Sequence, residues 1–543
     1  MNGFTTIDFI VLIVYVLGIA LFGAYFGKNQ KSTKDYFLGG RSIPWWAVGL
    51  SVMATQASAI TFIGAPGWGY DGGLERINTF INVPLVMAFL MVTIVPFFYR
   101  TEVYTAYEYL EKRFDVKTRS LTAGLFLVAR GLATGVVLYA PALVLSVITG
   151  IDVNITIIIM AVIAVAYTVL GGISAVIWTD VIQMFVLWFG AIFAIFTMVG
   201  YIPGGFSEAL SVGTDAGLMQ SLDFRFDLSI EYSIWAGILG GFFMHAAYFG
   251  TDQSQIQRVL TSKSLKESKM SLLVSGLFMF PQMLLFLFIG VLLYAFYQHA
   301  GDPGIENLNE LFPMFVVEYL PVGITGLIIA GVFAAAMSSL DSALNSLSAV
   351  SIRDFYAKFM KPNASEQHYL KASRWATVLW GLYATIFAFF AGNLGPVIEV
   401  VNRIGSYFYG ALLGVFLLAI FVRRANGTGA FAGVIAGMLA VWAVTVFADI
   451  SFLYNNLVGA VVAVGVGYAV SLIGKKPENE KLAGLVFHKD DADLQKVLEK
   501  RKDYAAQAEM ESEEDVKSMK KWPWILIGYF VFTILVLLFF QSL

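Results

Sequence analysis

The sequence predicts an all-α polytopic membrane protein with about fourteen transmembrane helices, and three observations indicate this class. Of the 543 residues, 58% are apolar and only 13% are charged, which exceeds the apolar material that a soluble core of this length holds. Uncharged runs such as 9–27 and 522–541 are long enough, at about 1.5 Å per residue, to cross about 30 Å of hydrocarbon. The Lys and Arg residues gather in alternate connecting segments, as they do in membrane proteins.

The predicted spans follow the apolar runs in chain order. They lie near residues 9–27, 46–67, 77–99, 119–148, 154–172, 177–202, 231–250, 270–297, 320–347, 370–391, 397–422, 428–448, 452–474 and 522–541. The first run is too long for the core of a signal peptide, and no basic segment precedes it. We therefore interpret it as a membrane span.

The positive charges predict the orientation of the chain. All but four of the 35 Lys and Arg residues lie in the loop after the first span or in every second loop after that one. Since such loops are cytoplasmic by the positive-inside rule, we expect both termini on the external face of the cell (inner) membrane. The charged segment 475–521 is then a cytoplasmic linker that faces water.

Two of the predicted spans carry polar residues and Gly/Pro-rich stretches at membrane depth. They are the second, SVMATQASAITFIGAPGWGY at 51–70, and the seventh, GGFFMHAAYFGTDQSQIQR at 240–258. A broken helix in lipid frees backbone groups, which must be used by the protein. Each of these spans begins a possible unit of five, and an odd number of spans inverts the second unit, as in many secondary transporters. The alternative is two ordinary helices whose hydroxyl groups are satisfied.

This division gives the predicted organisation of the chain. It consists of a first span and cytoplasmic loop (1–45), a first five-helix repeat (46–202), an external loop (203–230), a second, inverted repeat (231–422), two peripheral spans (428–474), the cytoplasmic linker (475–521) and a last span (522–543).

The ninth span carries a polar stripe in the run GVFAAAMSSLDSALNS. Ala335, Ser338, Ser339 and Ser342 follow the i, i+3, i+4, i+7 spacing of one helix face, and Asp341 flanks it. Close helix packing explains the small residues. It does not explain the carboxylate, which costs at least about 2.5 kcal/mol at this depth unless it is paired, protonated or bound to a cation.

A monovalent cation such as sodium needs a cage of oxygen atoms, by the same logic that governs other hard cations. The break near Ala54 and Ala57 would supply free carbonyl groups, and the serine stripe would supply hydroxyl groups. The chain has no cysteine, and its four histidines are scattered at 245, 299, 368 and 488, which argues against a zinc site.

Several motifs in one order resemble those of the sodium:solute symporter family. They are DYFLGGR (35–41), TAYEYLEKRF (105–114), VVLYAPALVL (136–145), GGISAVIWTDVIQ (171–183), QIQR (255–258) and AAAMSSLDSALNS (334–346). The resemblance implies a LeuT-like core of five plus five inverted helices. It also implies sodium-driven import of a small organic solute by alternating access, the solute being a sugar or polyol, or a carboxylate such as sialic acid or a monocarboxylate.

The resemblance also implies sodium ligands. The main site would consist of the backbone of Ala54, Ala57 and Ala335 with the hydroxyl groups of Ser338 and Ser339. A possible second site for sodium or a proton would consist of Asp180, Ser338, Asp341 and Ser342. Asp341 departs from the family pattern, in which a serine stands there, so it could strengthen this second site or take up a proton instead.

The substrate positions follow from the same resemblance. They are Gln56, Ser58, Thr61, Phe80, His245 and Asn402, with Tyr248 at the inner gate. The carboxylate-holding arginine of sialic-acid carriers would fall at Ala133, one turn from Arg130, which could substitute for it. The alternative for Arg130 is a structural ion pair, and for His245 it is an interhelical hydrogen bond.

The expected partners are therefore sodium ions, a small-molecule substrate and the lipid membrane, with no nucleic acid and no cofactor other than the coupling ion. The sequence gives no oligomeric state. Proton coupling through Asp341 or Asp180 is the main alternative, and a transporter-like sensor is a further one. No nucleophile–base pair or phosphate loop is visible, so we do not expect an enzyme.

Overall fold

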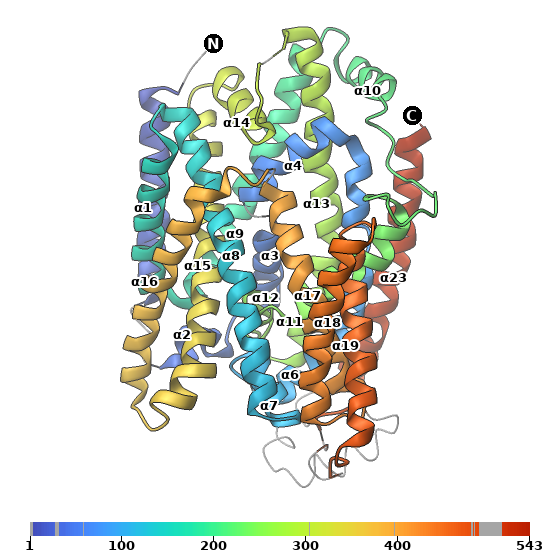
Figure 1. Cartoon of the computed structure of the whole chain (residues 1–543). Coiled ribbons are helices and arrows are strands. Elements are labelled where there is room, and N and C mark those ends of the chain that lie inside the picture. The colour runs from blue at the N-terminus through green and yellow to red at the C-terminus, as the bar shows by residue number, and fades with distance from the viewer. Residues whose placement is uncertain are drawn as a thin grey trace.

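The computed structural model describes residues 4–27, 32–57, 59–101, 103–302, 304–395, 397–478, 482, 484–487 and 513–542. Within these residues the chain forms a bundle of helices that run mainly along one axis (Figure 1). They contain no strand, only an isolated bridge between Ile43 and Ser262. The predicted all-α class is confirmed. Ser58 and most of the linker 475–521 lie outside the described residues.

The elements of the first half follow in chain order. They are α1 (Thr6–Gly27), α2 (Thr33–Leu38), η1 (Gly39–Arg41), α3 (Trp45–Gln56), α4 (Ala59–Gly72), η2 (Gly73–Thr79), α5 (Val83–Val92), α6 (Ile94–Arg100), α7 (Ala106–Arg113), α8 (Val116–Thr149), α9 (Val153–Tyr201) and α10 (Gly205–Asp215).

Those of the second half include two π-helical stretches, η3 and η4. They are η3 (Ala236–Gly241), α11 (Phe242–Thr251), α12 (Gln253–Val259), α13 (Leu265–Ala300), α14 (Leu308–Tyr319), α15 (Ile324–Val350), η4 (Ser351–Met360), α16 (Glu366–Ala391), α17 (Val397–Phe421), α18 (Gly427–Phe447), α19 (Tyr454–Ile473) and α23 (Glu513–Ser542).

Eleven helices among the described residues are long and apolar enough to cross a membrane, compared with fourteen predicted spans. The other three predicted spans correspond to shorter or interrupted helices. Predicted span 46–67 is divided between α3 and α4, span 231–250 between η3 and α11, and span 154–172 is reduced to the shorter apolar stretch Val153–Ala166. Gly172 interrupts α9 just after this stretch, at φ 60° and ψ −178°, a conformation that glycine alone adopts readily.

Both predicted helix breaks are present. Helix α3 ends at Gln56, Ala57 has the non-helical angles φ −86° and ψ 50°, and α4 begins at Ala59. Helix α11 ends at Thr251, and Asp252, with φ −74° and ψ 123°, leads into α12. Each break leaves carbonyl groups at the end of one helix and N–H groups at the start of the next without intrahelical partners.

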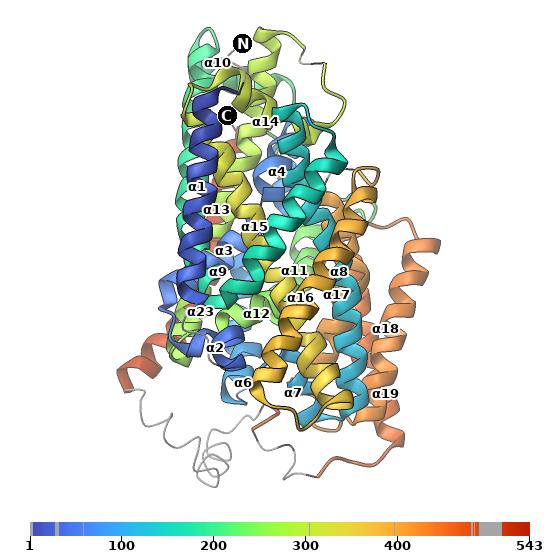
Figure 2. The ribbon, with the colours of Figure 1, turned by 90° about the vertical axis from the view of Figure 1, so that its left-hand side faces the viewer.

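The broken helices lie inside the bundle. Helix α15 packs against α9, α1 and α8, whereas α13 packs against α4, α3 and α5. Helices α18 and α19 pack mainly on each other and on α17, and Figure 2 shows them at the edge of the molecule. Helix α23 covers α5 and α13.

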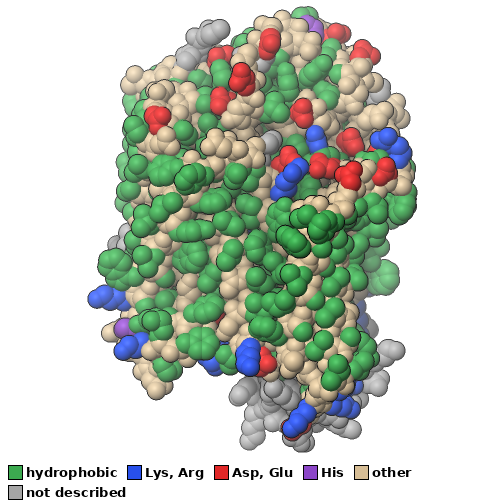
Figure 3. Space-filling view, in the orientation of Figure 1, with side chains coloured by type: hydrophobic (Ala, Val, Ile, Leu, Met, Phe, Trp, Pro, Cys, Tyr) green, Lys and Arg blue, Asp and Glu red, His purple; other side chains and the backbone are tan. Residues whose placement is uncertain are grey.

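The two termini lie toward the same end of the bundle in Figures 1 and 2. On the face drawn in Figure 3, acidic side chains gather toward this end and basic side chains toward the other, with an apolar band between them. This distribution fits the predicted orientation, which stays a prediction because no membrane fixes the direction.

Candidate functional site

A cavity lies between the two broken helices, α8, α15 and α17. The side chains that line it with polar groups are Thr55, Gln56, Thr61, Arg130, His245, Tyr248, Ser339, Asn402 and Tyr409. The apolar part of the wall includes Phe80, Val137 and Met244.

The structure brings six of the seven predicted substrate residues together in this wall. They are Gln56, Thr61, Phe80, Arg130, His245 and Asn402; the seventh, Ser58, lies outside the described residues. Tyr248, the predicted inner gate, lines the same cavity next to the second helix break. The side-chain nitrogen of Asn402 has no hydrogen-bond partner among the described residues, so it is available to a solute.

Arg130 combines the two roles that the sequence left open. Its side chain lines the cavity, and its Nη1 lies 3.7 Å from Oδ2 of Asp252. The same carboxylate accepts a hydrogen bond from the Tyr409 hydroxyl at 3.0 Å and caps α12 by accepting from the Ser254 N–H at 2.8 Å. The Nε of Arg130 is buried and has no partner among the described residues, so the guanidinium keeps unused hydrogen-bonding capacity.

His245 also has both predicted roles: it lines the cavity and makes an interhelical hydrogen bond. Its Nδ1 lies 2.9 Å from Oδ1 of Asn82. The Asn82 side-chain nitrogen donates to the carbonyl groups of Thr79 and Gly237, so its oxygen is the acceptor and His245 carries the proton on Nδ1. Phe80 packs beside the imidazole, with ring centres 5.1 Å apart.

The predicted main sodium site falls where α3 ends and α15 passes. Ala54 and Ala57 are buried at the end of α3, and Ala335, Ser338 and Ser339 are buried on α15, which contacts both halves of the broken span. The Ser339 hydroxyl has no hydrogen-bond partner among the described residues. An unsatisfied buried hydroxyl next to a helix end fits a site that contributes oxygen atoms to a cation.

The residues of the predicted second site make contacts with neighbouring side chains, while Asp180 Oδ1 and Asp341 Oδ2 are buried without a hydrogen-bond partner among the described residues. Arg258, from α12, donates a hydrogen bond from Nη2 to Asp180 at 3.3 Å and another from the same nitrogen to Ser342. The Asp180 carboxylate also accepts a hydrogen bond from Ser51 on α3. Asp341 faces α9 instead, where the Thr168 hydroxyl donates to its Oδ1.

Sequence reasoning missed Arg258, which it quoted only as part of the QIQR motif, and the pairing of Asp252 with Arg130. The available signal was charge: a fully buried arginine in a membrane protein requires an acidic partner, and the sequence places Asp180 within the sixth predicted span and Asp252 within the second broken segment. The sequence could not indicate which acid each arginine contacts.

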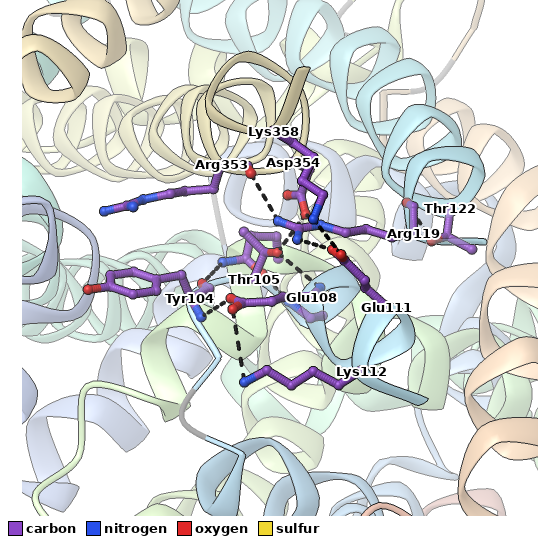
Figure 4. Close-up of polar contacts among 12 residues, drawn as sticks. Tyr104, Thr105, Glu108, Glu111, Lys112, Arg119, Thr122, Arg353, Asp354 and Lys358 are labelled. Carbon is purple, nitrogen blue, oxygen red and sulfur yellow. Dashed lines mark hydrogen bonds and ion pairs between the residues drawn. The ribbon is translucent and has the colours of Figure 1, made fainter. Parts of the chain in front are cut away.

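A charge cluster lies beyond the end of α15, where η4 follows it (Figure 4). Arg119 of α8 contacts Asp354 of η4 at 2.6 Å and Glu111 of α7 at 2.5 Å, and Lys358 of η4 contacts Glu111 at 2.5 Å. Burial raises the pKa of Glu111, but hydrogen bonds from Lys358 and Arg119 outweigh it and hold that pKa below its ordinary value. The cluster thus fastens α7 and α8 to the extension of α15.

Known proteins with similar sequences and structures share one transport class. The sequence profile of the sodium:solute symporter family matches residues 36–437. The sodium/sialic acid symporter SiaT of Proteus mirabilis is 33% identical over 480 residues, which are 86% of this chain and 95% of the relative. The sodium/sialic acid symporter NanT of Aliivibrio fischeri is 33% identical over 490 residues, 88% of this chain and 95% of its own.

A solved structure extends the likeness to the fold. It is that of a Na⁺-coupled sialic acid symporter in a substrate-bound outward-open state, which is 31% identical to this chain. The match covers 88% of this chain and 100% of the other, with a TM-score of 0.80.

Proposed function

The chain belongs to the sodium:solute symporter family, and we propose that its substrate is a small hydroxylated solute that bears a carboxylate. Sodium-coupled solute symport follows from the family, and the family resemblance of the motifs is confirmed. Its members and structural neighbours are secondary transporters, not enzymes. The identity of the solute is therefore argued from the residues that line the cavity.

The observation that carries the proposal is the position of Arg130. It is a buried guanidinium in the wall of a cavity whose other polar groups are amides, hydroxyls and the imidazole of His245. A guanidinium binds a carboxylate through two parallel hydrogen bonds. Amides and hydroxyls such as those of Gln56, Asn402 and Thr61 suit the hydroxyl groups of a sugar acid.

The existing partner of Arg130 leaves room for this ligand. Asp252 makes a single contact of 3.7 Å with Nη1, and its remaining hydrogen-bonding capacity serves Tyr409 and the start of α12. A carboxylate on the solute would bring an acceptor to the part of the guanidinium that the protein leaves unused, which includes Nε. Two of the relatives are sialic acid symporters, which supports an acidic sugar as the first candidate.

The same ion pair favours a second candidate, an uncharged sugar or polyol. Asp252 offsets the positive charge of Arg130, so the cavity would accept a neutral solute without leaving a charge unbalanced. The two candidates differ in what Arg130 contributes, and this difference can be measured.

Transport would follow alternating access. Sodium at the break of α3 and α4 would favour the outward-open state, and the solute would then favour closure, since each ligand only shifts populations between states. Each sodium charge that enters contributes about 2.3 kcal/mol per 100 mV of membrane potential. We also propose the cell membrane as the location.

Purified protein in liposomes tests the substrate class. Radiolabelled sialic acid, short carboxylates, neutral sugars and polyols are offered under an inward sodium gradient, and we expect the acidic sugar or another carboxylate to accumulate. Arg130→Ala should raise the KM for that solute at least about tenfold, because it removes charge-assisted hydrogen bonds worth about 1.5–3 kcal/mol each.

Two further variants show whether the effect comes from the paired donors of Arg130. Arg130→Lys preserves the charge but not the paired donors, so its KM should lie between those of the wild type and Arg130→Ala. Arg225→Ala removes an exposed arginine, with a side chain 76% accessible, and should leave uptake unchanged. Accumulation of neutral solutes alone, with KM unaltered in both Arg130 variants, would reject the carboxylate.

A further inference from the structure

A short part of the charged linker is docked against the rest of the protein. Leu482, Leu485 and Val486 are buried, each no more than 5% exposed, and Leu485 belongs to the main apolar core. The prediction that the linker faces water is therefore wrong for these residues. We call Leu482 together with residues 484–487 the strap.

The strap contacts two elements at the end of the bundle where α7 lies (Figure 1). The Tyr109 hydroxyl on α7 donates a hydrogen bond to the Leu485 carbonyl at 2.6 Å. The Phe487 N–H donates to the Ile420 carbonyl near the end of α17 at 2.8 Å. The rings of Phe487 and Phe421 also contact each other, with centres 5.9 Å apart. The strap is thus bonded to both α7 and α17.

Helix α7 and the end of α17 are also joined directly. Arg113, the last residue of α7, donates hydrogen bonds to the carbonyl groups of Ala419, Val422 and Ala425. The strap adds a second connection between the same two elements. It therefore fixes the position of α7 more firmly than Arg113 does alone.

Helix α7 is in turn bonded to the break in the second broken span. The Tyr107 hydroxyl donates to the Thr251 carbonyl at 3.0 Å. Gln253 bonds to the backbone at the start of α7, where its Nε2 donates to the Tyr104 carbonyl and its Oε1 accepts from the Ala106 N–H, both at 2.9 Å. All three hydrogen bonds lie where α11 passes into α12.

The same break supports the wall of the cavity. Asp252, between α11 and α12, pairs with Arg130 at 3.7 Å, and Tyr248 lines the cavity one turn before it. Glu111 on α7 also joins η4 through the charge cluster in Figure 4. A continuous set of contacts therefore runs from the strap through α7 to the cavity. A movement of the second broken span has either to break the bonds to α7 or to take α7 with it.

We propose that the strap controls the opening of the cavity toward the basic end of the bundle. Docked, it holds α7 as the support against which the second broken span is closed. Released, it lets α7 and the break move, which favours opening. Docking shifts the balance between the two arrangements because it adds contacts in only one of them. The inference rests on the alternating access proposed above, and it does not depend on which solute is carried.

A reversible bridge between the strap and α17 tests this inference. Phe421 and Phe487 are neighbours, each 44% exposed, and the chain contains no cysteine. In purified full-length Phe421→Cys/Phe487→Cys protein, a short bis-methanethiosulfonate reagent joins the two thiols, and dithiothreitol removes the bridge. We expect the bridge to slow hydrogen exchange of the α12 amides at least about threefold, since local opening governs that exchange. Equal exchange rates with and without the bridge would overturn the inference.

A bridge elsewhere at the same end of the bundle is the matched control. Tyr356 of η4 and His368 of α16 have ring centres 5.7 Å apart, and neither belongs to the strap. Tyr356→Cys/His368→Cys protein should therefore show the same exchange in α12 with and without its bridge. A similar slowing in this control would mean that any bridge at this end stiffens the break, and it would also overturn the inference.

The opposite change releases the strap. Leu485→Asp places a carboxylate where a buried leucine packs, so we expect the amides of α7 and α12 to exchange at least about threefold faster. In the triple variant with Phe421→Cys and Phe487→Cys, the bridge should restore slow exchange, which separates release of the strap from a general loss of folding. Fast exchange that persists in the bridged protein would contradict the role of the strap.

Sodium separates this inference from the proposed function. If sodium favours the outward-open state, it should slow exchange in α12 of the wild type, and Leu485→Asp should require more sodium for the same effect. If sodium has no effect in any variant while the bridge still slows exchange, sodium coupling fails and the strap inference stands. If sodium acts and the bridge does not, only the strap inference fails.

Discussion

The Ser339 hydroxyl lies in the wall of the cavity and is buried without a hydrogen-bond partner among the described residues. Nearby hydroxyls on the same helix are satisfied: Ser342 donates to the Ser338 carbonyl, and Ser346 donates to that of Ala343 at 2.9 Å. Leaving a buried hydroxyl unsatisfied costs about 1–3 kcal/mol, and the unused oxygen of Ser339 fits the proposed sodium site. This residue is where the main sodium site can be tested most directly.

Ser339→Ala should raise the sodium concentration for half-maximal uptake about fivefold, because losing one coordinating oxygen costs about 1 kcal/mol. The measurement is the sodium dependence of solute uptake in liposomes, with KM for the solute determined at saturating sodium. Ser346→Ala, which removes a satisfied hydroxyl from the same helix, is the control. An unchanged sodium dependence in Ser339→Ala would remove Ser339 from the site.

At the scale of elements, helix α15, which carries the serine stripe, is fixed at both ends. At its start, Oδ1 of Asp8 on α1 accepts from the N–H groups of Gly323 at 2.7 Å and Gly326 at 2.9 Å. At its other end, the charge cluster around Arg119 holds η4 against α7 and α8 (Figure 4). The serine stripe thus lies on a helix whose ends are anchored, which suits a site that must keep its geometry.

Helix α4, the second half of the first broken span, depends on close approach to α13. A Cβ atom added to Gly290 would lie 2.2 Å from the Pro66 carbonyl oxygen and 2.5 Å from the Tyr70 nitrogen. Both neighbours are backbone atoms, so they cannot move away without shifting the helix. Small residues allow such approach between helices in membranes.

Gly290→Ala should therefore lower the midpoint temperature of thermal unfolding in detergent, because overpacking costs about 1–3 kcal/mol. It should also reduce uptake, since α4 borders the cavity. Gly124→Ala in α8 is the matched control, because nothing lies within 4 Å of the Cβ it would add. Equal midpoints for the two variants would contradict the close packing of α4 and α13.

At the scale of the whole molecule, charge asymmetry predicts which way the chain faces. Asp215 is the last residue of α10, at the acidic end of the bundle, and Lys361 directly follows η4 at the opposite, basic end. Both residues are exposed. Because the chain contains no cysteine, a single introduced thiol reports on one position only.

We expect Asp215→Cys to react with a membrane-impermeant maleimide in right-side-out vesicles, and Lys361→Cys to react only after permeabilisation. The cysteine-free wild type should remain unlabelled in both conditions. The reverse pattern would show that the termini face the cytoplasm and that the positive-inside prediction is wrong for this chain.

The sequence by itself determined the membrane class and the helix breaks, and the family resemblance of its motifs supplied the candidate residues of the cavity. Apolar runs, interruptions by polar and Gly/Pro residues, and the spacing of the serine stripe are local patterns, and the bilayer constrains each of them separately. The number of long spanning helices differs from the predicted fourteen, because α3, α11 and the stretch before Gly172 are too short or interrupted to form single long helices.

Only the tertiary structure decided which charges meet. Arg258 reaches Asp180 across 78 positions and Ser342 across 84, while Arg130 pairs with Asp252 on another helix. No local pattern encodes such contacts, since each depends on how helices far apart in the chain pack together. The sequence therefore predicted a cation site on the serine stripe, and the packing of α12 against α3 and α15 placed the guanidinium of Arg258 against Asp180 and Ser342.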